Sequence, residues 1–128
     1  ANRGILMRPG IATRTIDQEG RSAYENTPQR FSRVMSAASA EKLTAMMQRV
    51  VQEGTGTAAA LSGIEVAGKT GTAEIDVINN ISQPWFIAFA PASDPQVAIA
   101  VTIEKTVGGF GGTDAAPIAK AVMESLLR

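Results

Sequence analysis

The 128-residue sequence contains no cysteine and no histidine. These absences exclude a disulfide-stabilised scaffold, and they remove the ligands on which zinc and iron–sulfur centres chiefly depend. Catalysis by Ser-His-Asp or Cys-His groups is excluded as well, so any nucleophile must take a lysine, a tyrosine or a carboxylate as its base. We therefore expect neither a bound metal nor a cofactor.

The sequence also lacks an excess of charge of either sign. Twelve Lys and Arg residues balance twelve Asp and Glu residues, so the basic surface of a nucleic-acid-binding protein is not predicted. Hydrophobic residues make up 45% of the chain and charged residues 19%, which favours a folded domain over disorder. The longest apolar-leaning stretch, Trp85 to Ile103, is interrupted by two prolines and is too broken to span a bilayer.

Local patterns predict an α+β fold, in which helices pack on an antiparallel sheet. Residues 11–26 contain two semi-extended runs around the turn 17–20, which predicts a hairpin. Further strands are predicted within 64–76, at 85–90 and at 97–105. The last two are joined by a short proline-containing segment, so they should pair antiparallel. In the last strand Val and Ile residues form one face. The opposite face carries small residues, which would allow a helix to pack closely against it.

Two amphipathic helices are predicted around these strands. The first begins after Ser39 as its N-cap and stops at Gly54, and a short helical turn is predicted within the small-residue link 55–61. The second is capped by Asp114, carries Pro117 in its first turn and runs to Leu127. The predicted inward positions are Leu43, Met46, Met47, Val50 and Val51 on the first helix and Ile118, Ala121, Val122 and Leu126 on the second.

The most informative stretch for chemistry is Ala67–Glu74, which contains Lys69-Thr70-Gly71 at the start of a predicted strand. Three common residues meet by chance in many chains, and the tripeptide can also be a surface strand with a solvated lysine. The small neighbouring residues, the two strands that follow and the C-terminal helix give it more weight. K-T-G accompanies S-x-x-K and S-D-N in serine β-lactamases and penicillin-binding proteins.

The sequence resembles the C-terminal part of a class B penicillin-binding protein transpeptidase domain, with actinobacterial division-type members closest. The resemblance covers essentially the whole chain. It implies that residues 1–128 are the C-terminal segment of a single domain with the penicillin-binding protein and serine β-lactamase fold. The matching stretches, in order, are Ala1–Gly4, Met46-Met47 with Val50-Val51, Gly54–Ala58, Ala67–Glu74, Trp85-Phe86 and Asp114–Pro117.

The K-T-G residues suit the binding of a peptide carboxylate. The Lys69 ammonium can hold the carboxylate, the Thr70 hydroxyl can donate to it, and Gly71 leaves room for a ligand backbone. If the strand is an edge strand, the N–H of Thr72 can stabilise an oxyanion. The resemblance implies the same assignment: all four residues bind substrate, and Lys69 and Thr72 are catalytic. Strict alternation places Lys69 and Thr70 on opposite faces, so their meeting in one cleft requires strand twist.

The other two motifs of this family are missing from the chain. No S-x-N occurs, and the single S-x-x-K match, Ser39-Ala40-Glu41-Lys42, lies too few residues before Lys69 for the family's order. We interpret Ser39 as an N-cap and Lys42 as a solvent-facing side chain. Tyr24-Glu25-Asn26 resembles a Y-x-N motif but is predicted to lie in a loop. The chain is therefore expected to contain no nucleophile and to be inactive alone.

The resemblance implies a function in the cell wall. The parent protein would be a peptidoglycan D,D-transpeptidase that cross-links stem peptides through a serine acyl-enzyme and binds β-lactams. It would act at the extracytoplasmic face of the bacterial membrane, anchored by an N-terminal helix that this chain lacks. The expected partners are stem peptides, β-lactams, the remainder of the domain and a second copy through an exposed sheet edge. The alternatives are a β-lactam sensor or hydrolase of the same fold, and a non-catalytic interaction module.

Overall fold

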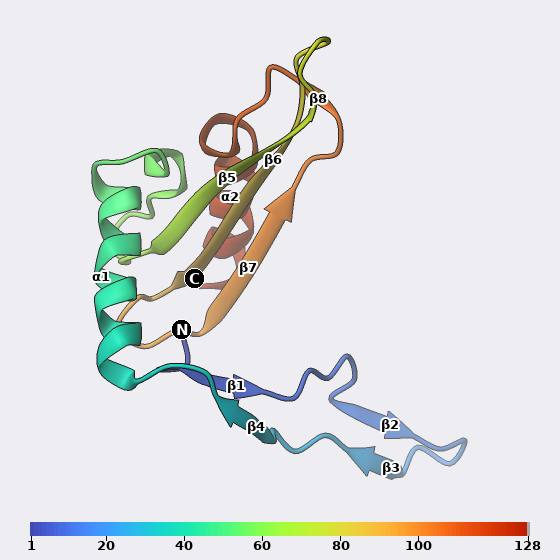
Figure 1. Cartoon of the computed structure of the whole chain (residues 1–128). Helices are drawn as coiled ribbons and strands as arrows, with labels where there is room; N and C mark the ends of the chain where they lie inside the picture. Colours follow the sequence, from blue (N-terminus) through green and yellow to red (C-terminus); the bar gives the residue numbers. More distant parts are fainter. Residues whose placement is uncertain (128) are drawn as a thin grey trace.

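A computed structural model describes residues 1–127 of the chain (Figure 1). Four short strands precede the first helix, four more follow it, and the second helix ends the fold. The elements in chain order are β1 (Ile5–Met7), β2 (Arg14–Ile16), β3 (Ser22–Glu25), β4 (Arg30–Arg33), α1 (Ala37–Gln52), the 3₁₀ turn η1 (Thr57–Ala59), β5 (Ala67–Asp76), β6 (Ile81–Ala90), β7 (Val97–Thr102), β8 (Thr106–Val107), the π-helical turn η2 (Gly111–Ala115) and α2 (Ala116–Leu126).

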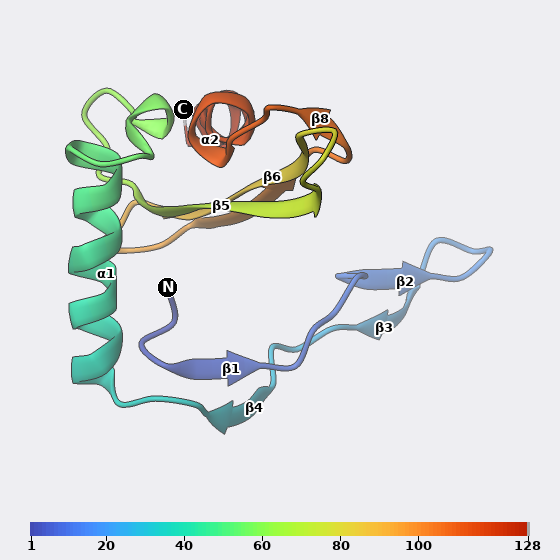
Figure 2. The same cartoon turned by 45° about the horizontal axis from the view of Figure 1, so that its top comes forward.

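The main sheet is antiparallel with the strand order β5-β6-β7, and β8 pairs with the start of β6. In Figure 2, α2 covers one face of this sheet, and α1 stands across the end at which β5 begins. Val51 of α1 lies beside Gly68, near the start of β5. The predicted α+β architecture and the antiparallel pairing of β6 with β7 are confirmed, as is the helical turn in the link after α1.

The core lies between the sheet and α2. The helix contributes mainly small side chains to it, and the sheet contributes large ones. Phe86 of β6 and Met123 of α2 are fully buried. Alanines at 115, 116 and 119 let the helix approach closely, and Val97, Ile99 and Val101 of β7 pack against the same cluster. The prediction that the small residues of β7 would meet a helix is wrong. The helix supplies the alanines and the strand supplies the branched side chains.

The predicted inward face of α2 is wrong for the same reason. Ile118, Ala121, Val122 and Leu126 are exposed, whereas Ala116, Ala119 and Met123 are buried. Helical winding also begins earlier than predicted, because the turn η2 already starts at Gly111. Asp114 lies inside that turn and accepts hydrogen bonds from the Phe110 N–H at 2.8 Å and the Thr113 hydroxyl at 2.7 Å.

The first helix begins three residues before the predicted position. Ser36, not Ser39, is the N-cap: it has an extended backbone, and its hydroxyl accepts from the Ser39 N–H at 3.0 Å. Val51 is buried as predicted, and Met47 packs against Ala67, Phe89 and Ala92. The predicted inward placement of Leu43 and Met46 is wrong, because these residues are 42% and 58% exposed.

The four N-terminal strands form an arm that extends away from the sheet (Figures 1 and 2). β1 pairs with β4, and β2 pairs with β3 as the predicted hairpin. Asp17 holds the hairpin turn by accepting from the Arg21 N–H and guanidinium, both at 2.9 Å. Tyr24 and Glu25 belong to β3, so the loop prediction for that stretch is wrong. Neither helix within residues 1–127 is long and apolar enough to cross a membrane.

Candidate functional site

The K-T-G residues lie on an edge strand. β5 is hydrogen-bonded to β6 on one side, and within residues 1–127 no strand pairs with its other side. In the register, Lys69 is opposite Ile87, Thr70 opposite Phe86 and Gly71 opposite Trp85. Phe86 is buried beneath α2, whereas Ile87 and Trp85 lie on the open face of the sheet. Lys69 and Thr70 therefore project from opposite faces, as strict alternation predicts.

The Lys69 side chain nevertheless returns to the strand. Its ammonium donates to the carbonyl oxygen of Thr70 at 2.6 Å, and the side chain is exposed. A four-carbon stem can reach around the strand edge in this way, whereas a short side chain could not. The reach of the lysine brings its charge next to the Thr70 carbonyl.

The Thr70 side chain lies on the helix-covered side and meets the link after α1. Its hydroxyl oxygen is 2.7 Å from that of Thr55. The link is folded back tightly, because the N–H groups of Gly54 and Gly56 both donate to the Val50 carbonyl, at 3.2 and 2.9 Å. The hydroxyl of Thr70 is therefore paired with a neighbour whose backbone is fixed to the end of α1.

A cavity of about 570 Å³ opens beside these two threonines. Threonine side chains and glycines dominate its wall, so it offers hydroxyl groups and backbone amides rather than charges. Of the predicted site residues, Thr70 and Thr72 line it, Lys69 lies at the neighbouring edge, and Gly71 belongs to the other face. The lining residues are Gly54, Thr55, Thr57, Ala58, Thr70, Thr72, Phe110, Gly111, Gly112 and Thr113.

Two glycines of η2 pack closely against β5 and the link after α1, on the side of the cavity. A Cβ atom at Gly111 would overlap the carbonyl oxygen of Trp85 and lie 2.6 Å from that of Gly71, and one at Gly112 would overlap the carbonyl of Thr55. Backbone approaches this close require glycine. The sequence patterns assigned no role to this segment. The signal that was available is the pair of adjacent glycines immediately before a helix.

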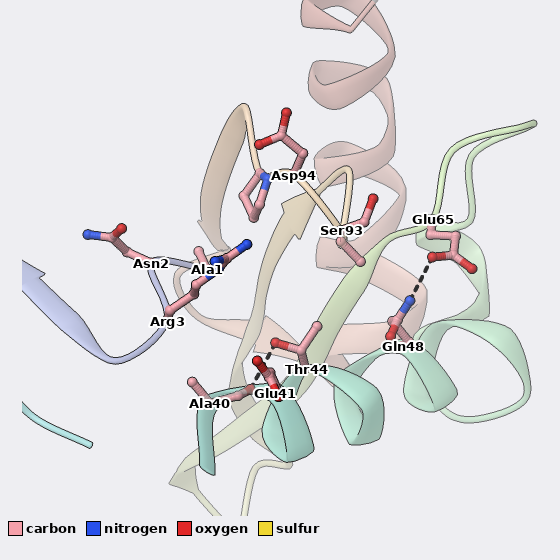
Figure 3. A pocket seen from close by; sticks show the side chains of 12 residues that line it. Ala1, Asn2, Arg3, Ala40, Glu41, Thr44, Gln48, Glu65, Ser93 and Asp94 are labelled. Carbon is pink, nitrogen blue, oxygen red and sulfur yellow. Dashed lines mark hydrogen bonds between the residues drawn. The ribbon is translucent and has the colours of Figure 1, made fainter. Parts of the chain in front are cut away.

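A second cavity, of about 610 Å³, lies at the opposite end of α1 (Figure 3). Arg3, Glu41, Glu65 and Asp94 give it charges of both signs, and the Gln48 amide donates to Glu65 at 2.9 Å. It contains none of the predicted site residues. The cavity beside β5 is therefore the candidate site.

The S-x-x-K match lies far from that site. Ser39 is in the first turn of α1, where its hydroxyl is 2.9 Å from that of Ser36, and Lys42 is exposed as predicted. The helix has 16 residues and is thus about 24 Å long at 1.5 Å per residue. Since Thr55 follows the far end of the helix, Ser39 cannot serve the cavity beside Thr70.

Comparison with known proteins identifies the family. The penicillin binding protein transpeptidase domain matches residues 1–124. The chain belongs to this family. Peptidoglycan D,D-transpeptidase PbpA of Mycolicibacterium smegmatis is 38% identical over 133 residues, a match that covers 100% of this chain and 27% of that protein. PbpA of Mycobacterium tuberculosis is 36% identical over 136 residues, again over 100% of this chain and 27% of that protein.

Solved structures agree with this assignment. Penicillin-binding protein A from M. tuberculosis, as a ceftriaxone acyl-enzyme complex, superimposes with a TM-score of 0.90 at 34% identity. That match covers 99% of this chain and 29% of the M. tuberculosis chain. The D,D-transpeptidase domain from Eggerthella lenta gives 0.84 at 37% identity, over 98% of this chain and 30% of that chain. The predicted family and fold class are confirmed, and the chain spans about a quarter of the curated relatives it matches.

Proposed function

We propose that this chain supplies the K-T-G wall of the active site in a peptidoglycan D,D-transpeptidase that cross-links stem peptides and binds β-lactams. One observation carries the proposal: the ammonium of Lys69 lies against the Thr70 carbonyl at the free edge of β5, and the Thr70 side chain lines the cavity beside that edge. A ligand lying along this edge has a cation and a hydroxyl donor for its carboxylate. The wall contains no acidic side chain that would repel that carboxylate.

The backbone of β5 would supply the oxyanion donor. In an antiparallel strand the N–H and C=O of one residue point to the same side, and alternate residues share that side. The contact between the Lys69 ammonium and the Thr70 carbonyl supports a position of this carbonyl at the free edge. Thr72 would direct its N–H to the same edge, where it can stabilise a tetrahedral oxyanion. Gly71, between them, lets a substrate backbone lie against the strand.

The serine nucleophile and its lysine base are proposed to lie in another part of the same domain. The related M. tuberculosis protein has been captured as ceftriaxone and penicillin G acyl-enzymes, and this chain spans 29% of those structures. Residues 1–128 would then form the C-terminal segment of the domain. The whole protein would act at the extracytoplasmic face of the membrane, where peptidoglycan is assembled.

Labelling with a fluorescent penicillin tests this function. The natural protein that contains this chain should form a stoichiometric covalent adduct that survives denaturation, whereas the 128-residue chain should form none. Slow release of the adduct fits a transpeptidase or a sensor, and rapid release would instead identify a hydrolase. An adduct on the isolated chain that disappears in Ser39→Ala would contradict both the assignment of roles and the structural reading of Ser39.

A further proposal concerns the outer edge of β7. Its residues Val97–Thr102 contain neither charge nor proline, and within residues 1–127 only β6 pairs with this strand. Unpaired strands of this type recruit other strands. We expect the isolated chain to dimerise through β7 at micromolar concentration in analytical ultracentrifugation, and the double variant Ala98→Lys/Ala100→Lys to be monomeric. A wild-type monomer would show that this edge needs no partner.

A further inference from the structure

Thr55 is the side chain through which the first helix reaches the K-T-G strand. Its hydroxyl oxygen lies 2.7 Å from that of Thr70, and the two residues come from different elements. The sequence placed Thr55 in a small-residue link that matches the family, but it assigned no role to this side chain. The contact joins the link after α1 to the residue of β5 that is proposed to bind the substrate carboxylate.

The backbone of Thr55 is held on both sides. Before and after it, the N–H groups of Gly54 and Gly56 donate to the Val50 carbonyl. From the other side Gly112 packs against the Thr55 carbonyl so closely that a Cβ atom there would overlap it. A hydroxyl on so constrained a backbone is a fixed partner, and it can select one rotamer of the threonine that it contacts.

The hydrogen bond between the two hydroxyls can run in either direction, and the two directions differ in what they offer a ligand. A hydroxyl has one proton to donate and two lone pairs that accept. If Thr70 donates to Thr55, it presents only lone pairs to the cavity. If Thr55 donates to Thr70, the Thr70 proton is free, and a carboxylate, which only accepts, can bind it.

We infer that Thr55 is a positioning residue: it donates its hydroxyl proton to Thr70 and so aims the Thr70 proton at the substrate carboxylate. This inference rests on the proposed carboxylate-binding function of Thr70. Hydrogen bonds in a chain polarise one another, so the Thr70 hydroxyl becomes a stronger donor when Thr55 donates to it. The effect belongs to carboxylate binding rather than to the covalent step. Loss of the Thr55 hydroxyl should therefore raise the concentration of β-lactam needed for half-maximal acylation and leave the limiting rate unchanged.

The test compares two probes on the natural protein that contains this chain: benzylpenicillin, and its methyl ester, which lacks the carboxylate charge. Thr55→Val keeps the shape and removes the hydroxyl, and it should weaken apparent benzylpenicillin binding roughly 3- to 10-fold. The limiting acylation rate and the reaction with the ester should not change. Thr55→Ser should restore wild-type values, and Thr15→Val in the arm is the matched control. A structural defect would slow both probes alike and would persist in Thr55→Ser.

The variant Thr70→Val distinguishes the carboxylate-binding role of Thr70 from the positioning role of Thr55. It should weaken benzylpenicillin binding more, roughly 10- to 100-fold, because a charge-assisted contact is lost directly. If Thr70→Val shows this loss and Thr55→Val matches the wild type, the positioning role is wrong and the proposed function stands. If Thr70→Val also matches the wild type, or if Thr55→Val weakens both probes equally, the inference is overturned. Wild-type behaviour of Thr70→Val would also contradict the proposed role of Thr70 in carboxylate binding.

Discussion

The N-terminal arm and the main sheet are both antiparallel β-structure, yet they differ in what holds them. Phe86 in the sheet is fully buried against α2, whereas Phe31 in the arm is 63% exposed. In β2 and β3 every residue is exposed, and the hairpin is held by its ladder and by the turn around Asp17. A strand pattern therefore predicts pairing, but only the helix layer gives a strand the fixed position that a binding site needs.

Truncation of a phenylalanine should show the largest difference between the two regions. Phe86→Ala should lower the free energy of unfolding by about 3–5 kcal/mol, because it leaves a cavity in the core. Phe31→Ala loses mainly its contact with Arg8, whose guanidinium lies 5.7 Å from the ring centroid, and should cost about 1 kcal/mol or less. Urea denaturation monitored by the single tryptophan, Trp85, measures both. Equal losses would show that the arm belongs to the same cooperative core.

Substitution of a glycine by alanine in each region should give a smaller difference in stability than the phenylalanine truncations. Here the cause is a steric clash or backbone strain rather than a cavity. Gly111→Ala forces a Cβ atom into the Trp85 carbonyl, which should cost about 1–3 kcal/mol of global stability by overpacking. Gly20 has a φ of +80° but open space around it. Gly20→Ala therefore strains only the hairpin turn, by about 1–2 kcal/mol.

Hydrogen exchange distinguishes these two outcomes. Gly111→Ala should raise exchange throughout β5, β6 and α2, while Gly20→Ala should raise it only in β2 and β3. Spread of the Gly20→Ala effect into the main sheet would contradict the separation of arm and sheet.

Acid should produce the smallest effect, and it should be local. Hydrogen bonds from the Arg21 backbone N–H and guanidinium lower the pKa of Asp17, and those from the Phe110 N–H and the Thr113 hydroxyl lower the pKa of Asp114. A carboxyl whose pKa is lower in the folded state stabilises the fold above its ordinary pKa of about 3.9. That contribution is lost as the pH falls through the folded-state pKa.

NMR titration of amide resonances tests the local character of this loss. The Arg21 amide should report loosening of the hairpin turn at low pH, and the Phe110 amide should report loosening of η2. In Asp17→Asn the first transition should vanish and the second should persist. Loss of both transitions in that variant would show that the hairpin turn and η2 loosen together, which contradicts the local character of the effect.

Much of the fold and part of the site could be predicted because the determining signals are local. Alternation located β7, the turn at 17–20 located the hairpin, and the K-T-G spacing placed Lys69 and Thr70 on opposite faces of β5. The family resemblance added what no local pattern contains, namely an expected role for these residues.

The features that could not be predicted depend on contacts between elements distant in sequence. An alanine face and an Ile–Val–Leu face on α2 are both plausible inward faces until the bulk of the facing strand is known. Trp85 and Phe86 are adjacent large aromatic residues, and only the packing shows which of them is in the core: Phe86 fills the space under α2, and Trp85 is 38% exposed on the other face. The contacts of Thr55 with Thr70, and of Gly111 with Gly71, likewise join separate elements.

The central claim is that the Lys69 charge at the edge of β5 serves acylation rather than folding. The most direct measurement is the acylation rate of Lys69→Ala by a labelled penicillin in the natural protein, together with its unfolding midpoint. We predict a rate at least roughly 100-fold lower and an unchanged midpoint, since the side chain is exposed. The matched variant Lys42→Ala should leave both unchanged. Wild-type acylation by a folded Lys69→Ala, or loss of acylation in Lys42→Ala, would contradict the account.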